Sequence, residues 1–246
     1  MARGPSLNLT IAEKRYAAGA APVLAGIDLT IAAGSVTAIL GPSGIGKSTL
    51  LRLIAGLDTQ FTGSIQIDGQ SPIDAPSPGF VFQDPRLLPW LTVLDNIRTA
   101  GQGVDTATAL SALERTGLTT AANLYPRQLS GGMQRRASLA RALAMSSGLL
   151  LLDEPFVSLD RALVSEMQDL VADIITADKP TTLLVTHMPE DAARLAGRVL
   201  ILAGQPAKVV ADLALPAPIA MRERQTIASY VEMIEAATDY RRIPAE

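Results

Sequence analysis

A glycine-rich run between an apolar segment and a helix-forming segment constrains this chain more than any other feature. The run is Gly41-Pro42-Ser43-Gly44-Ile45-Gly46-Lys47-Ser48-Thr49. Residues 36–40 are almost continuously apolar, which predicts a central buried strand, and a helix is predicted to start near Lys47. The glycines let backbone N–H groups approach phosphate oxygens without a Cβ in the way, and the helix adds the positive end of its dipole. The run therefore predicts a phosphate-binding loop.

Two acidic residues follow a second apolar run and complete a candidate nucleotide site. In the loop, Lys47 is placed to reach the β- and γ-phosphates, and Ser48 to supply a hydroxyl ligand to Mg²⁺. Asp153 follows the leucines 149–152, so we expect a carboxylate at the carboxyl edge of a buried strand, where it also suits Mg²⁺. Glu154 is placed to polarise an attacking water. We predict ATP and Mg²⁺ as cofactors; ATP is favoured over GTP because an Asn-Lys-x-Asp guanine-binding motif is absent.

The remaining patterns predict an α/β protein with a helical insertion. Further strands are predicted at 7–10, 27–31, 63–68, 79–83, 149–152, 181–186 and 198–203. From residue 84 to about 144 the pattern is helical. We therefore expect one domain over 1–246, with a core of 1–83 and 146–215, a helical subdomain at 84–145 and a C-terminal helix at 216–246. On that helix Ile227, Val231 and Ile234 share one face, which either packs on its own domain or contacts a partner.

Composition excludes several classes of function. The 246 residues are 48% hydrophobic and 18% charged, with no cysteine and a formal net charge of −3. This charge argues against nucleic acid as a partner, which usually requires a basic stripe. No uncharged apolar run approaches the roughly 18 residues that span a bilayer, and the N-terminus does not resemble a secretory signal. We expect a soluble, cytoplasmic chain, so any transport role requires a pore on another polypeptide.

A third motif, Leu129-Ser130-Gly131-Gly132-Met133, precedes a helix-forming segment. Ser130 fits a helix N-cap, and the two glycines leave N–H groups open to an anion. In its order after the phosphate loop and before Asp153-Glu154, this motif resembles the nucleotide-binding cassette of the ABC transporter superfamily. The resemblance runs from about residue 7 to 202. It implies a P-loop NTPase fold with a RecA-like core, an antiparallel β edge and an inserted α-helical subdomain.

The resemblance also implies roles for residues that spacing alone does not assign. Gln83 matches the glutamine that senses Mg²⁺ and the attacking water, and His187 matches the switch histidine that contacts the γ-phosphate. Tyr16 matches the aromatic residue that stacks on adenine, although an exposed tyrosine at a strand edge is the alternative. In the family, the 130–132 turn faces the ATP of a second subunit. The segment 158–160 matches the loop that crosses to that subunit.

Within the superfamily, residues 83–97 and Met133 resemble the ATPases of nitrate, sulfonate and taurine importers. Such a protein works as a homodimer with transmembrane permease subunits, served by a periplasmic or lipoprotein solute-binding protein, peripherally at the cytoplasmic face of the inner membrane. The segment 87–90 would contact the permease, or is buried in its own fold. Two departures from the wider pattern are Met133 in place of glutamine and Met188 in place of aspartate. The alternatives are a thiamine-type importer, a lipid or solute exporter, and a soluble ABC ATPase acting on DNA or ribosomes.

Overall fold

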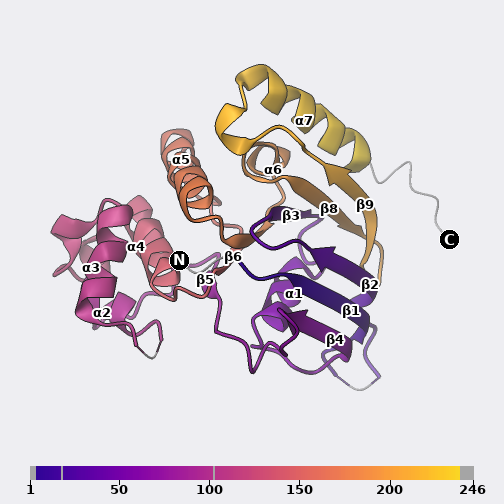
Figure 1. The fold of residues 1–246 in the computed structure, drawn as a ribbon, viewed down its shortest axis with the longest axis horizontal. Helices are drawn as coiled ribbons and strands as arrows, with labels where there is room; N and C mark the ends of the chain where they lie inside the picture. Colours follow the sequence, from indigo (N-terminus) through magenta and orange to yellow (C-terminus); the bar gives the residue numbers. More distant parts are fainter. Residues whose placement is uncertain (1–3, 18, 102, 239–246) are drawn as a thin grey trace.

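The computed structural model describes residues 4–17, 19–101 and 103–238, which form two β-sheets and surrounding helices (Figure 1). The strands are β1 (Leu7–Lys14), β2 (Leu24–Ile31), β3 (Val36–Leu40), β4 (Thr62–Ile67), β5 (Gly79–Val81), β6 (Leu149–Asp153), β7 (Thr181–Val185), β8 (Arg198–Ala203) and β9 (Lys208–Ala214). The α-helices are α1 (Lys47–Ile54), α2 (Val93–Arg98), α3 (Thr106–Arg115), α4 (Gly131–Leu143), α5 (Arg161–Asp178), α6 (Pro189–Leu195) and α7 (Arg224–Thr238), and the short 3₁₀ turns are η1 (Thr119–Ala121), η2 (Pro126–Gln128) and η3 (Ile219–Met221).

The larger sheet has the strand order β5-β6-β7-β3-β8-β9. Its pairs are parallel except β8 with β9, which are antiparallel. Every residue of β3, β6 and β7 is buried, as their continuous apolar sequences predict for strands covered on both faces. Because these three neighbouring strands run in the same direction, the loops that follow them meet at one edge of the sheet.

The two faces of this sheet pack against different layers. Along β6, Leu149 and Leu151 join the core that includes α1 and the antiparallel sheet β2-β1-β4. Leu150 and Leu152 point the other way, into a core shared with α5, α6 and α7. Helix α1 therefore lies between the two sheets (Figure 1). Its packing there holds the loop that joins β3 to α1 in place.

Helices α2, α3 and α4 form a third apolar cluster at one end of the molecule (Figure 1). Val93, Ile97 and Leu113 are fully buried within it. Leu139 and Leu143 on α4 belong instead to the core beneath the large sheet. Helix α4 thus connects the helical layer, which lies within the segment predicted to be helical, to the central sheet.

Apart from shifts of up to four residues at the ends of strands, two features differ from the predictions. Strand β9 was not predicted, because as the edge strand it leaves alternate residues exposed and its sequence has no apolar run. The C-terminal helix begins at Arg224 rather than near 216, because Pro216 and Pro218 cannot continue a helix and Arg222 donates hydrogen bonds to carbonyls of the extended segment before it. Residues 239–246 of the predicted helix lie outside the described residues.

The apolar face of α7 packs on its own chain. Ile234 and Tyr230 are buried, with Ile227 and Val231 beside them in the core of the large sheet. The Tyr230 hydroxyl also accepts a hydrogen bond from the N–H of Ala217 at 3.0 Å. This packing accounts for the stripe without a partner. Among the described helices, none has the length and apolarity needed to cross a membrane.

Candidate functional site

The loop between β3 and α1 has the conformation that its glycines predict. Gly44 and Gly46 have φ of +78° and +112°, in the left-handed region that favours glycine. Gly46 is the N-cap of α1, and a Cβ on it would lie 2.7 Å from a methyl group of Leu24. The first N–H groups of α1 have no partner within the helix. The loop and the helix end therefore present N–H groups to an anion at the edge of the sheet.

Lys47 is buried, and its ammonium group lies inside this loop. Its Nζ donates hydrogen bonds to the carbonyl oxygens of Gly41 and Pro42, at 2.8 and 2.9 Å. Burial lowers the pKa of Lys47, while the carboxylates of Glu154 and Asp153 act in the opposite direction. The ammonium is thus held where a phosphate group entering the loop would meet it.

Ser48 and Asp153 meet as predicted, although they come from different elements. The Ser48 hydroxyl donates a hydrogen bond of 2.9 Å to Oδ1 of Asp153, whose side chain is 6% exposed. Burial raises the pKa of Asp153, and the bond from Ser48 partly offsets this. A hydroxyl and a carboxylate oxygen are hard ligands that suit Mg²⁺. In the part of the chain that the structure describes, no cluster of three acidic or histidine side chains could hold a metal alone. A magnesium ion here would therefore need phosphate and water oxygens as its other ligands.

Glu154 lies between Lys47 and His187. Its Oε1 is 3.8 Å from Lys47 Nζ, and its Oε2 is 3.4 Å from His187 Nδ1. The backbone of Glu154 has φ of +47°, and its N–H donates to the carbonyl of Val185 at 2.9 Å, at the end of β7. This unusual backbone turns the carboxylate toward the loop. The His187 ring is 42% exposed and open to a ligand.

Tyr16 lies near the loop, whereas Gln83 does not join the cluster. The Tyr16 hydroxyl is 2.6 Å from Oγ1 of Thr49, and its ring is 56% exposed. The side chain of Gln83 is exposed and, among the described residues, makes no hydrogen bond to Ser48 or Asp153. Its backbone carbonyl instead accepts a hydrogen bond from Arg135 on α4.

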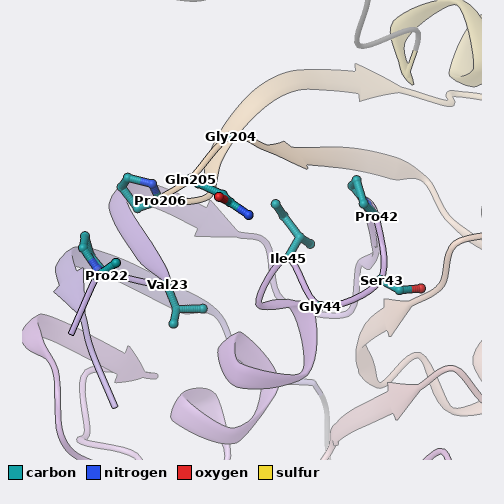
Figure 2. A pocket seen from close by; sticks show the side chains of 10 residues that line it. Pro22, Val23, Pro42, Ser43, Gly44, Ile45, Gly204, Gln205 and Pro206 are labelled. Carbon is teal, nitrogen blue, oxygen red and sulfur yellow. The ribbon is translucent and has the colours of Figure 1, made fainter. Parts of the chain in front are cut away.

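A cavity of about 780 Å³ lies along the outer side of the phosphate loop (Figure 2). Loop residues Pro42 to Ile45 form one wall, Pro22 and Val23 another, and the turn between β8 and β9 the third. Figure 2 shows Gln205 of that turn reaching toward Ile45. The sequence does not predict that this turn lies beside the loop, because its residues are distant in sequence and carry no local motif.

The motif at 130–132 forms the start of α4, in the helical layer. The Ser130 side chain accepts a hydrogen bond from the N–H of Met133 at 3.2 Å, as predicted for an N-cap. Ser130 and Gly131 are exposed, but Gly132 is buried, and a Cβ on it would lie 3.0 Å from Leu163 on α5. None of the cavity residues or cluster residues described above comes from this motif. Within the described residues, one chain does not bring together the two helix starts that the sequence predicts to bind anions.

These observations define the class of the protein. A phosphate loop joins a buried parallel strand to a helix, and a second strand places a carboxylate against the serine of that loop. This is the arrangement of a P-loop nucleoside triphosphatase. Comparison with known proteins then narrows the class to one family. The family model described as "ABC transporter" matches residues 24–157, more than half of the chain, and the chain belongs to this family. As a member of it, the chain is an ABC-type ATPase, and the resemblance seen in the sequence is confirmed.

Individual relatives agree with this assignment. An aliphatic sulfonates import ATP-binding protein of Burkholderia lata is 42% identical over 83% of this chain and 76% of its own length. A protein with the same description from Pseudomonas aeruginosa is 42% identical over 85% of this chain and 87% of its own length. The ATP-binding cassette MJ0796, solved as a dimer in a post-hydrolysis state with ADP and Pi, matches with a TM-score of 0.75 and 32% identity, over 86% of this chain and 99% of the other.

Proposed function

We propose that this chain hydrolyses ATP to power a membrane importer of aliphatic sulfonates or a related small anion such as nitrate or taurine. The observation that carries the hydrolysis is the meeting of Lys47, Ser48, Asp153 and Glu154 at one edge of the sheet. The similarity to sulfonate import ATP-binding proteins over more than four-fifths of the chain supports the direction of transport and the class of solute.

In this proposal each side chain of the cluster has one role. The N–H groups of the loop and the Lys47 ammonium bind the β- and γ-phosphates, with Tyr16 beside them for the adenine ring. Ser48 and Asp153 would hold Mg²⁺, which would neutralise charge on the phosphates when bound. Glu154 accepts the proton of the attacking water, and His187 contacts the γ-phosphate. Phosphoryl transfer depends mainly on such positioning and charge stabilisation.

Gln83 is assigned a role that requires movement. Its exposed side chain does not contact the predicted Mg²⁺ ligands, and it begins the segment that leads into the helical layer. Approach of Gln83 to the nucleotide would therefore accompany a shift of the helical subdomain, for which we retain the boundaries 84–145. The same shift would also move α4, because Arg135 of that helix donates a hydrogen bond to the backbone carbonyl of Gln83.

A second copy of the chain completes the site in this proposal. Ser130 and Gly131 are exposed at the tip of α4, available to the phosphates bound by another subunit. The dimeric form of MJ0796 supports such an arrangement. Gly132 is buried against Leu163, so in this proposal only Ser130 and Gly131 contact the nucleotide directly.

The membrane partner would dock beside the segment after Gln83. Trp90 is 69% exposed there, and a cavity of about 840 Å³ opens between the core and the helical layer, lined by Phe82, Leu88 and Arg141 among others. An exposed tryptophan beside an open cavity of this kind fits a permease subunit, with a solute-binding protein acting from the opposite side of the membrane. In this proposal the chain acts at the cytoplasmic face of the inner membrane, as a peripheral subunit.

The test is reconstitution of the chain with its permease in vesicles. Addition of the solute-binding protein loaded with an aliphatic sulfonate should raise ATP hydrolysis, and uptake of the sulfonate should require ATP. Nitrate, taurine and thiamine serve as competing solutes. Export of solute from preloaded vesicles, or co-purification with ribosomes instead of a permease, would replace the proposal by one of its alternatives.

A further inference from the structure

A buried polar cluster lies directly behind His187 and has no part in the roles assigned so far. Asp191 on α6 is 5% exposed. Its Oδ1 accepts a hydrogen bond of 2.8 Å from Nε2 of Gln168 on α5, and its Oδ2 accepts one of 2.6 Å from the hydroxyl of Thr186 at the end of β7. Gln168 and Thr186 are also buried. Because an unpaired polar group in a protein interior is costly, a satisfied cluster of this kind holds its members in one arrangement.

The Thr186 hydroxyl fixes the backbone on both sides of His187. It donates to Asp191, and it also accepts a hydrogen bond of 3.0 Å from the N–H of Met188. The N–H of Thr186 bonds in turn to the carbonyl of Ile39, at the end of the strand that leads into the phosphate loop. The Thr186 side chain therefore restrains the backbone at residues 186 and 188, on either side of His187. Its ring nitrogen Nδ1 is directed at Glu154 at 3.4 Å.

Gln168 connects this arrangement to α5. That helix begins at Arg161, shortly after Glu154, and is capped by Asp160, whose side chain accepts from the N–H of Leu163 at 2.9 Å. A cavity of about 690 Å³ lies between α5 and the segment after β7, and Gln168, His187 and Asp191 all line it. Beside this cavity, the Gln168–Asp191 hydrogen bond is a direct polar contact between α5 and the segment that carries His187.

We propose that Asp191, Thr186 and Gln168 form a positioning relay. Their hydrogen bonds orient the His187 imidazole toward the nucleotide and make its position depend on α5. The inference rests on the proposed role of His187 in ATP hydrolysis. None of the three side chains contacts substrate in this scheme. Their effect is on where the imidazole lies when the reaction occurs, so they should control turnover more than nucleotide binding.

The decisive comparison is Thr186→Val against Thr186→Ser in the full chain. Valine keeps the shape of threonine and removes the hydroxyl, while serine keeps the hydroxyl and loses a buried methyl group. We expect Thr186→Val to lower kcat by about 10- to 100-fold, the range that misplacement of a catalytic group produces, with KM for ATP changed by less than about threefold. Thr186→Ser should keep kcat within about threefold of the parent. Thr186→Val also leaves Oδ2 of the buried Asp191 without its donor and should be less stable than the parent, so kcat is compared at a temperature where denaturant titration shows both variants to be folded. A purely structural role predicts that folded Thr186→Val hydrolyses ATP at the parental rate.

Thr182→Val is the matched control. Thr182 lies on β7, the strand that Thr186 follows, and is equally buried. Among the described residues, its hydroxyl makes only a 3.4 Å contact with the carbonyl of Pro180. It should keep the parental kcat. Gln168→Met, which removes the donor to Asp191 and preserves volume, should give a kcat between those of the parent and Thr186→Val. A parental rate in Thr186→Val overturns the relay, and a parental rate in Gln168→Met overturns its link to α5.

His187→Ala separates this inference from the proposed function. If His187→Ala abolishes turnover while Thr186→Val does not, the proposed role of His187 stands and the relay fails. If His187→Ala hydrolyses ATP at the parental rate, both are overturned. Loss of turnover in His187→Ala and Thr186→Val, with activity kept in Thr186→Ser, supports both.

Discussion

Substitution of Glu154 by glutamine should separate ATP binding from ATP turnover. Glutamine keeps the length and shape of the side chain but removes its charge and its ability to take a proton at neutral pH. The backbone of residue 154 has φ of +47°, a conformation that costs a glutamine as much as a glutamate, so the variant adds no backbone strain of its own. The fold should therefore be retained.

The surroundings of Glu154 set the size of the two effects. The carboxylate is 14% exposed and 3.8 Å from Lys47 Nζ, where two unit charges attract by about 4 kcal/mol at an effective dielectric constant of 20, before the cost of desolvation is counted. Removing this negative charge leaves Lys47 free to interact with phosphate. It also removes the repulsion between the Glu154 carboxylate and the phosphate. ATP should bind equally well or more tightly. Loss of a general base should lower kcat by about 10²- to 10⁴-fold.

The assay is steady-state ATP hydrolysis beside a titration of nucleotide binding, with size-exclusion chromatography in the presence of ATP. Blocked turnover should leave a stable ATP-bound dimer that the parent does not accumulate. Glu166→Gln is the control, because Glu166 is exposed and, in the described part of the chain, forms an ion pair only with Arg136 on the surface. Turnover in Glu154→Gln within about threefold of the parent would reject Glu154 as the base, and much weaker ATP binding would show that its charge serves the fold of the loop instead.

Three further substitutions test other parts of the structure. Lys47→Ala removes the buried ammonium and should weaken ATP binding by at least about 10-fold, since a hydrogen bond to a charged group contributes roughly 1.5–3 kcal/mol; an unchanged titration would contradict the phosphate-loop assignment. Asp153→Asn, without Mg²⁺ or nucleotide, should raise the free energy of unfolding at neutral pH, because burial raises the pKa of Asp153. The stability that the Asp153 carboxyl contributes is therefore present below its unfolded pKa of about 4 and is lost as pH rises through the folded value. Denaturant titrations should show this gain vanish in acid, and a gain that persists there would contradict the argument. Ile234→Ala should destabilise the protein by about 2–5 kcal/mol, whereas Met233→Ala on the exposed side of α7 should change it by less than about 0.5 kcal/mol; thermal melts with similar losses in both would show that α7 is not docked as described.

The strands that could be predicted are those whose sequence alone determines their burial. Residues 36–40 and 198–203 match β3 and β8 at both ends, because a short and almost continuously apolar run is typical of a strand covered on both sides. Strand β9 could not be found in this way. Its sequence alternates weakly, and it is a strand because β8 offers it an unpaired edge, which is a property of the assembled sheet and not of residues 208–214.

The same distinction applies to the site. Lys47 and Ser48 could be placed because the geometry of the phosphate loop is local: the glycines, the helix start and the two side chains lie in one short segment. The contact of Arg135 with the Gln83 carbonyl and the turn that places Gln205 beside the loop could not. Each depends on how distant elements pack, and a single sequence gives no signal for such a meeting.

What brings the chemistry together is the register of three parallel strands. Asp153 pairs with Val185 across β6 and β7, and Val185 pairs with Ile39 across β7 and β3. The residues that follow these positions therefore emerge at the same level, which puts Glu154 beside His187 and both beside the phosphate loop. A shift of β6 by one residue would turn the Asp153 side chain to the opposite face of the sheet, away from Ser48. Because the four leucines of β6 alternate between two packed cores, such a shift would also exchange the leucines of those cores. The apolar packing that stabilises the sheet is thus the same constraint that aligns the carboxylates with the loop.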